Sequence, residues 1–324
     1  MNPLTALYGA ATALRNTLYD RSLLSSRQLE RPVVSVGNLS VGGSGKTPFV
    51  IALGERLKAR GIRFDVLARG YRRKTRGVLV VETNGNAADF GDEPLLIAGR
   101  LGVPVVVGES RYDAGRIAEQ KFDSQLHVLD DGFQHRSLAR DFDIILMTER
   151  DFDDRMLPSG RLREPLSSLQ RADAIVLPQN FPGKNFSVHD LTIESLARQG
   201  KFIWSVKREF AAPDAPAEPI VFCGIARPRQ FFAQVRAAGI TPAAEVEFRD
   251  HHAYNRSDIE RLLALQGTLG AGGFLTTEKD AINLGLLQAE LDPLAVGALS
   301  LTLEHPTDIV DAILARTIFA KSGN

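Results

Sequence analysis

The sequence predicts an α/β protein in which a larger unit with a mainly parallel sheet is followed by a smaller α/β unit. Short apolar strands alternate along the chain with runs of helical periodicity, which is typical of a parallel sheet covered by helices on both faces. Residues 209–219 are rich in proline and alanine, interrupt this alternation and predict a linker. With an amphipathic helix at the N-terminus, we expect domains at 1–30, 31–208 and 209–324.

Composition excludes several classes of protein. The 39 basic and 39 acidic residues of the 324-residue chain balance, so no nucleic-acid partner is predicted and any cationic site has to be local. The single cysteine, Cys223, excludes a disulfide framework and is typical of a reducing compartment. It ends an apolar run, so we expect it to pack in the core. The sequence contains no run of 18 apolar residues, so no membrane-spanning helix is predicted.

The first element is the predicted N-terminal helix. Its apolar residues recur at helical spacing and are Leu4, Leu7, Tyr8, Ala11, Leu14 and Leu18. Two interpretations are open. The helix packs against its own domain, or its apolar face lies in the plane of a membrane at the headgroup boundary.

The next element is a buried strand at 33–36 that leads into a glycine-rich loop and then a helix. Such a loop, called a P-loop, directs backbone N–H groups at a polyphosphate, and the helix adds the positive end of its dipole. Lys46 is expected to reach the β- and γ-phosphates, and the Thr47 hydroxyl is a Mg²⁺ ligand by type. The predicted nucleotide-binding residues are Ser40, Val41, Gly42, Gly43, Ser44, Gly45, Lys46 and Thr47, with Ser40 in place of the first glycine of the general pattern.

Beyond this loop, the strands expected in the larger unit are 64–67, 78–81, 103–107, 126–129, 142–147, 174–177 and 202–206. Helical runs at 93–101 and 111–120 lie between them. The smaller unit resumes with strands at 220–223, 244–248, 274–277 and 298–303 and helices at 228–238, 257–265 and 308–319. We therefore expect two α/β units that share a cleft.

Two adjacent carboxylates, Asp130 and Asp131, end the strand at 126–129. In a sheet with a phosphate loop, a neighbouring strand commonly delivers an acidic residue to Mg²⁺. Adjacent carboxylates repel each other, and a cation between them and a phosphate removes that repulsion. Asp-Asp-Gly is also an ordinary turn, but the loop upstream favours the metal site.

Asp92 stands at a predicted boundary between a loop and a helix, before Pro94, which suits a first helical turn. Its carboxylate can cap that helix, or it can act as a general base that accepts the proton of an attacking hydroxyl. The residues alone leave the two roles equally open.

Two cationic segments can contact an anionic substrate. Residues 69–77 hold five cations, which form either a solvated loop or a phosphate-binding site, because guanidinium groups bind phosphate bidentately. Residues 161–165 add further contacts to phosphate and metal.

The predicted contacts with substrate and metal come from several segments. The substrate-binding residues that we predict are Arg72, Arg111, Gln134, His135 and Arg163. The metal ligands that we predict are Thr47, Asp130, Asp131 and Glu164.

Paired histidines, His251 and His252, follow a strand of the smaller unit. Such a pair suggests zinc, but no third ligand occurs nearby at a finger-like spacing. A histidine hydrogen-bonded to a carboxylate, which it tunes or orients, is the simpler interpretation.

Seven segments of the chain, in their order, resemble the tetraacyldisaccharide 4'-kinase family, the lipid A 4'-kinases of Gram-negative bacteria. They are the P-loop at 37–48, Arg-Gly-Tyr at 69–71, Gly-Asp-Glu at 91–93, Asp-Asp-Gly-Phe-Gln-His at 130–135, Leu-Arg-Glu-Pro at 162–165, Asp-His-His at 250–252 and Thr-Glu-Lys-Asp at 277–280. The similarity extends from the N-terminal helix to about residue 285. Serine at position 40 is ordinary in this family.

The resemblance implies ATP- and Mg²⁺-dependent transfer of the γ-phosphate to the 4'-hydroxyl of a tetraacylated glucosamine disaccharide 1-phosphate, which forms lipid IVA. It implies a catalytic cleft between two α/β units, in which Asp92 is the base and His251 supports it from the other unit. Together with Lys46 they make up the expected catalytic set. It also implies peripheral attachment to the cytoplasmic face of the inner membrane by the N-terminal helix. No protein partner is predicted.

Two other classes of protein are alternatives. A membrane-associated partition-type ATPase shares the Gly-Gly-x-Gly-Lys-Thr loop, but it carries a signature lysine where this chain has Val41. A nucleotide-sensing adaptor without catalysis would not need Asp92. Transfer of γ-phosphate to the disaccharide lipid by the purified protein would exclude both.

Overall fold

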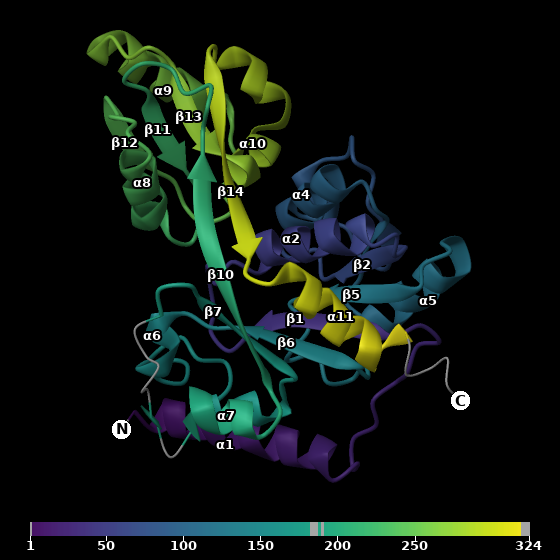
Figure 1. Cartoon of the computed structure of the whole chain (residues 1–324). Coiled ribbons are helices and arrows are strands. Elements are labelled where there is room, and N and C mark those ends of the chain that lie inside the picture. Colours follow the sequence, from purple (N-terminus) through teal and green to yellow (C-terminus); the bar gives the residue numbers. More distant parts are fainter. Residues whose placement is uncertain (1, 182–186, 189–190, 319–324) are drawn as a thin grey trace.

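The computed structural model describes residues 2–181, 187–188 and 191–318, and its described residues form one sheet of 12 strands and a separate two-stranded ribbon (Figure 1). The order in the large sheet is β12 (Ala244–Glu247), β11 (Ile220–Cys223), β13 (Phe274–Thr277), β14 (Leu294–Leu303), β10 (Phe202–Ala211), β7 (Ala174–Pro178), β6 (Phe142–Leu146), β1 (Val33–Asn38), β5 (Leu126–Asp130), β2 (Phe64–Ala68), β4 (Val105–Val107) and β3 (Leu79–Val80). The ribbon pairs β8 (Ser187–Val188) with β9 (Leu191–Thr192). Only the β10–β14 and β3–β4 pairs of the large sheet are antiparallel, so the predicted α/β class with a mainly parallel sheet is confirmed.

The helices between these strands are α1 (Pro3–Asp20), α2 (Lys46–Ala59), α3 (Ala87–Phe90), α4 (Asp92–Leu101), α5 (Arg111–Lys121), α6 (Glu149–Phe152), α7 (Ile193–Arg198), α8 (Pro228–Ala237), α9 (Arg256–Leu269), α10 (Glu278–Leu284) and α11 (Pro306–Arg316). Short 3₁₀ helices span Leu166–Arg171 and Gly285–Glu290. Alternate residues of β1 face opposite layers, since Val34 packs in a core with Phe49 of α2, whereas Val33 packs in a core with Ala114 of α5. Helices therefore cover both faces of the sheet.

Two long antiparallel strands, β10 and β14, join the larger and the smaller unit (Figure 1). The predicted linker at 209–219 is wrong for its first three residues, because Glu209, Phe210 and Ala211 continue β10 and pair with Ser300, Leu299 and Ala298 of β14. Tertiary packing extends the strand, since the Phe210 ring also meets the ring of Phe231 at a centroid distance of 5.7 Å. The domain boundary expected between 208 and 209 falls inside this strand.

The last described helix, α11, returns the chain to the larger unit. The predicted helix at 308–319 is found as Pro306–Arg316, and Phe319 lies outside the described residues. Four buried side chains of α11 pack in the core of the larger unit, and they are Ile309, Val310, Ile313 and Leu314. The chain after β14 thus contributes to the unit that holds the P-loop.

The contribution of α11 packing to stability can be tested with Ile313→Ala. Ile313 is fully buried, so we expect the free energy of unfolding to fall by about 2–4 kcal/mol through lost burial and a residual cavity. Urea unfolding followed by circular dichroism measures the change. Asp311→Ala, on the exposed side of the same helix, removes only a surface pair with Arg60 and should cost less than about 1 kcal/mol. Equal effects of the two substitutions would contradict the packing of α11 in this core.

Candidate active site

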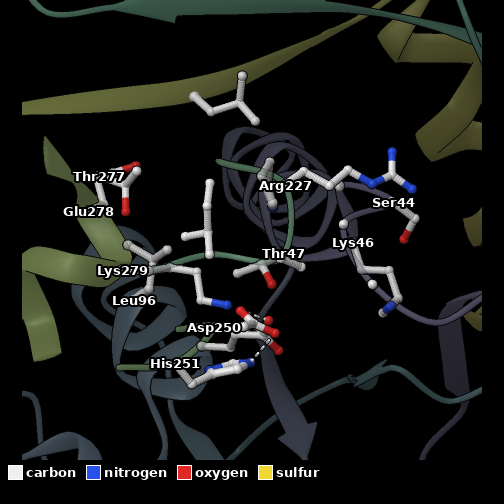
Figure 2. A pocket seen from close by; sticks show the side chains of 18 of the residues that line it. Ser44, Lys46, Thr47, Leu96, Arg227, Asp250, His251, Thr277, Glu278 and Lys279 are labelled. Atoms are coloured by element: carbon white, nitrogen blue, oxygen red, sulfur yellow. Dashed lines mark hydrogen bonds and ion pairs between the residues drawn. The ribbon is translucent and has the colours of Figure 1, made fainter. Parts of the chain in front are cut away.

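A cavity of about 630 Å³ lies between the two units. The P-loop forms one wall, and residues of the smaller unit, including Asp250, His251 and Lys279, form the other (Figure 2). The loop follows the carboxyl end of β1, and Asp130 ends the neighbouring strand β5. Parallel strands present their carboxyl ends at one edge of a sheet, which is where α/β proteins commonly bind ligands.

The P-loop has the conformation that its glycines predict. Gly45 precedes α2 with a φ of 89°, a left-handed value that favours glycine. The Lys46 ammonium donates to Asn38 Oδ1 at 3.0 Å and lies 3.4 Å from Asp131 Oδ1. Arg163 also contacts Asp131, with nitrogen–oxygen distances of 2.8 and 3.0 Å. All eight predicted nucleotide-binding residues line the cavity.

Two arginines beside the P-loop were missed by the sequence reasoning. Arg208 of β10 donates to the carbonyl of Ser44 at 2.7 Å. The Arg227 side chain lies so close to Gly43 that a Cβ at that glycine would come within 2.8 Å of it. Burial lowers the pKa of both guanidinium groups, and one buried nitrogen of each has no hydrogen-bond partner. Nothing in the local sequence marks these residues, because Arg208 reaches the loop from β10 and Arg227 reaches it from the start of α8 in the smaller unit.

The predicted metal ligands divide into two groups. Thr47, Asp130 and Asp131 line or border the cavity, whereas Glu164 is buried away from it and bonds to Asn16 and Arg171. Among the described residues, no cluster of three or more His, Cys, Asp or Glu side chains could hold a metal ion by itself.

Asp130 and Asp131 have opposite electrostatic surroundings. Burial, with the negative charges of Glu93 and Asp131, raises the pKa of Asp130, and its Oδ1 has no hydrogen-bond partner. Burial also acts to raise the pKa of Asp131, but Lys46 and Arg163 outweigh it and hold that pKa well below its usual range. Asp130 is thus the carboxylate that lacks a cationic partner.

Of the predicted substrate-binding residues, only Arg163 lines the cavity. Arg72 is exposed and donates to the Asp250 carbonyl, and Gln134 donates to the Asn38 carbonyl at 3.0 Å. Arg111 is buried at the start of α5, and burial lowers its pKa to about 10. His135 is half-buried, and burial followed by repulsion from Arg111 lowers its pKa to about 4.

Asp92 joins the two units. Its Oδ1 accepts the N–H of Glu93 at 2.8 Å, while its Oδ2 lies 2.7 Å from Nδ1 of His251 and accepts from Asn283 at 3.2 Å. Lys279 Nζ lies 2.9 Å from Glu93 and 3.9 Å from Asp92. His251 thus lies against the carboxylate, and the smaller unit adds Lys279 and Asn283, for which the sequence reasoning gave no role.

The pKa of Asp92 follows from these contacts. Burial alone would raise it, but the His251 hydrogen bond and the Lys279 charge outweigh burial and lower the pKa from 3.8 to about 2. The carboxylate is therefore ionised at neutral pH and able to accept a proton. Gly91, with a φ of 89°, makes the sharp turn that places Asp92 at the start of α4.

Comparisons with known proteins show to which family this chain is similar. A family model described as tetraacyldisaccharide-1-P 4'-kinase matches residues 1–318. A tetraacyldisaccharide 4'-kinase of Koribacter versatilis is 47% identical over alignments that cover 97% of this chain and 98% of that protein. One of Geobacter metallireducens is 37% identical, with 96% and 95% covered. A crystal structure titled as the "apo" form of LpxK from Aquifex aeolicus in complex with ATP superposes with a TM-score of 0.78, at 35% identity and with 97% and 98% of the two chains covered.

The depressed pKa of Asp92 predicts how stability depends on pH. A carboxylate whose pKa is lower in the native than in the unfolded state stabilises the protein above the unfolded value, and this stabilisation is lost as pH falls through the native value. For a shift from 3.8 to about 2, we expect a loss of about 2 kcal/mol between pH 6 and pH 2.

Urea unfolding gives the free energy of unfolding of wild type and of Asp92→Asn at pH 6 and at pH 2. We expect the difference in free energy between the two proteins to be smaller at pH 2 than at pH 6. The exposed Asp214 provides the control, because Asp214→Asn removes a carboxylate that makes no ion pair with the described residues. A constant difference between wild type and Asp92→Asn would contradict the assigned contacts.

Proposed function

The chain belongs to the tetraacyldisaccharide-1-P 4'-kinase family, which acts in lipid A biosynthesis, and we propose how its cleft carries out that phosphoryl transfer. One observation carries the proposal. The P-loop of the larger unit and His251 of the smaller unit line one cavity, and His251 Nδ1 lies 2.7 Å from Asp92 Oδ2 of the larger unit. The acceptor is the 4'-hydroxyl of an acylated glucosamine disaccharide 1-phosphate, and the donor is ATP.

In this proposal the triphosphate lies along the P-loop. Backbone N–H groups and the N-terminus of α2 face the phosphates, and Lys46 exchanges its contacts with Asn38 and Asp131 for phosphate oxygens. The unpartnered nitrogens of Arg208 and Arg227 supply further positive charge at the same loop. The crystal structure of the relative from Aquifex aeolicus is of a complex with ATP, which supports ATP as the nucleotide bound here.

The cavity also fits Mg²⁺. Asp130 has a buried oxygen without a partner, and burial together with the negative charges of Glu93 and Asp131 raises its pKa, so a cation beside it would stabilise the ionised carboxylate. We propose that Asp130 and the Thr47 hydroxyl would hold the ion, which would supply positive charge to the phosphates. Asp131 stays paired with Lys46 and Arg163. Glu164 is not retained as a ligand, because it does not line the cavity and its Oε2 already accepts from Arg171 and Asn16.

The proton of the attacking hydroxyl goes to the Asp92–His251 pair. Asp92 is ionised and is assigned the role of base, while His251 lines the cavity beside it and shares the hydrogen bond at 2.7 Å. The base comes from the larger unit and its partner from the smaller one, so the pair is complete only when the two units face each other in this way.

The N-terminal helix supports a position at the membrane surface. Leu4, Leu7 and Leu14 of α1 are 60%, 68% and 62% exposed, and none of its described residues is buried. The other side of α1 is held to the larger unit by polar contacts, in which Tyr8 donates to the Arg163 carbonyl and Asn16 to Glu164. Within the described ranges, no helix has the length and apolarity to cross a bilayer. We propose that the exposed leucines insert at the headgroup boundary of the inner membrane on its cytoplasmic face.

The phosphate site can be tested with Lys46→Ala. We expect kcat for transfer from ATP to the disaccharide lipid to fall by a factor of about 10²–10³, because Lys46 stabilises charge on the transferred group. The measurement follows ³²P transfer to the lipid by wild type and variant. Lys58→Ala, at the far end of the same helix, should keep near wild-type activity. Retention of more than about a tenth of kcat in Lys46→Ala would overturn the assignment of the loop.

Membrane attachment can be tested without deleting α1. Replacing Leu4, Leu7 and Leu14 together with glutamine removes the apolar face and leaves the polar contacts of Tyr8 and Asn16 intact. We expect flotation with anionic vesicles to be lost. The matched control replaces the exposed Ala6, Ala10 and Ala13 with glutamine, which adds the same amides and keeps the leucines. Unchanged flotation of the leucine variant would show that α1 only packs against its own unit.

A further inference from the structure

The smaller unit places Lys279 close to Asp92, and the proposed reaction gives this lysine no role. We infer that Lys279 is a positioning residue, which pairs with Glu93 across the cleft and thereby holds the first turn of α4, with Asp92 in it, against His251. The inference rests on the proposed function, because Lys279 is proposed to position the Asp92–His251 pair, which accepts the proton of the substrate hydroxyl. Four contacts and a distribution of charge carry it.

The first two contacts come from one face of α10. Lys279 and Asn283 are four residues apart on this helix and therefore lie on the same side of it. Lys279 Nζ lies 2.9 Å from Glu93 Oε1, and Asn283 donates to Asp92 Oδ2 at 3.2 Å. The first turn of α4 thus meets a matched pair of donors from the smaller unit.

The other two contacts tie Asp92 to both of its neighbours. Oδ1 accepts the N–H of Glu93, so the position of the carboxylate depends on the same turn that Lys279 holds through the Glu93 side chain. Oδ2 lies 2.7 Å from His251 Nδ1. A displacement of the turn would therefore lengthen the bond between Asp92 and His251.

The carboxylates around Lys279 explain why a positive charge is favourable at this position. Glu93, Asp130, Asp250 and Lys279 line the cavity, and the Lys279 side chain is 22% exposed. Asp250 and Lys279 are labelled in Figure 2, and Asp92 lies 3.9 Å from the Lys279 ammonium. Burial would lower the pKa of Lys279, but Glu93 and Asp92 outweigh burial and raise it. The ammonium is thus a permanent charge, suited to holding carboxylates in place and unsuited to donating a proton.

A second ion pair across the same helix interface provides a matched control. Arg100, at the other end of α4, lies 2.6 Å from Glu278 of α10 and contacts neither Asp92 nor His251. Arg100→Met breaks a cross-unit ion pair of the same kind and leaves the catalytic pair untouched. Lys279→Met removes the ammonium and keeps the length of the side chain, and Lys279→Arg restores a cation.

The experiment measures kcat, KM for ATP and the affinity for a fluorescent ATP analogue. We expect Lys279→Met to lower kcat at least about tenfold, with KM and analogue affinity changed less than twofold. Lys279→Arg should recover much of kcat, and Arg100→Met should match wild type. Because Lys279 acts through Glu93, the variant carrying both Glu93→Gln and Lys279→Met should be little worse than the worse single variant.

Each contrary result has a distinct meaning. An unchanged kcat in Lys279→Met, or an equal loss in Arg100→Met, overturns the inference and leaves the kinase assignment in place. A loss of nucleotide affinity with kcat retained would show that Lys279 binds phosphate, and it also overturns the inference. If Lys279→Met fails to fold, Lys279→Arg and Glu93→Gln decide the matter, since the first should be active and the second impaired. A wild-type protein that transfers no phosphate overturns the proposed function and this inference together.

Discussion

The antiparallel pairing of β10 with β14 is the constraint on which the rest of the molecule depends. Six residue pairs, from Val206 with Leu303 to Ala211 with Ala298, join two parallel sheets into one. This ladder sets the carboxyl edge of the smaller sheet opposite the P-loop of the larger one (Figure 1). It also carries Arg208 to the loop, and the chain after β14 then packs into the core of the larger unit. A single backbone interaction therefore decides which side chains can meet in the cleft.

The three aspartates in and beside that cleft differ in the cationic partners that they have, and these partners come from different units. Asp131 is neutralised inside the larger unit by Lys46 and Arg163. Asp92 obtains its partners His251, Lys279 and Asn283 from the smaller unit, across the cavity. Asp130 has no such partner and retains a buried oxygen without a hydrogen bond. One carboxylate is thus neutralised within its own unit and one through the association of the two units, whereas the third keeps an oxygen without a hydrogen-bond partner.

The position of α1 connects this chemistry with a lipid substrate. The helix contacts the segment that contains Arg163, a residue of the cavity wall, through Tyr8 and Asn16. Leu4, Leu7 and Leu14 of this helix are exposed. A helix held by polar contacts on one side and left apolar on the other can bring the cleft close to the bilayer in which an acylated disaccharide resides. The structure thus shows the packing of α1 against its own unit, whereas insertion of its exposed leucines at a membrane surface stays a proposal.

The sequence by itself determined the local elements and the residues whose type implies their chemistry. A strand, a glycine-rich loop and a helix predicted the P-loop, because glycine at positive φ and apolar periodicity are local properties. Motif order predicted the family and the partnership of Asp92 and His251. Only the tertiary structure decided the extent of β10, the place of α11, the roles open to Arg208 and Lys279 and the seclusion of Glu164. These depend on strand pairing and side-chain contacts between residues far apart in the chain, and no local pattern encodes such distances.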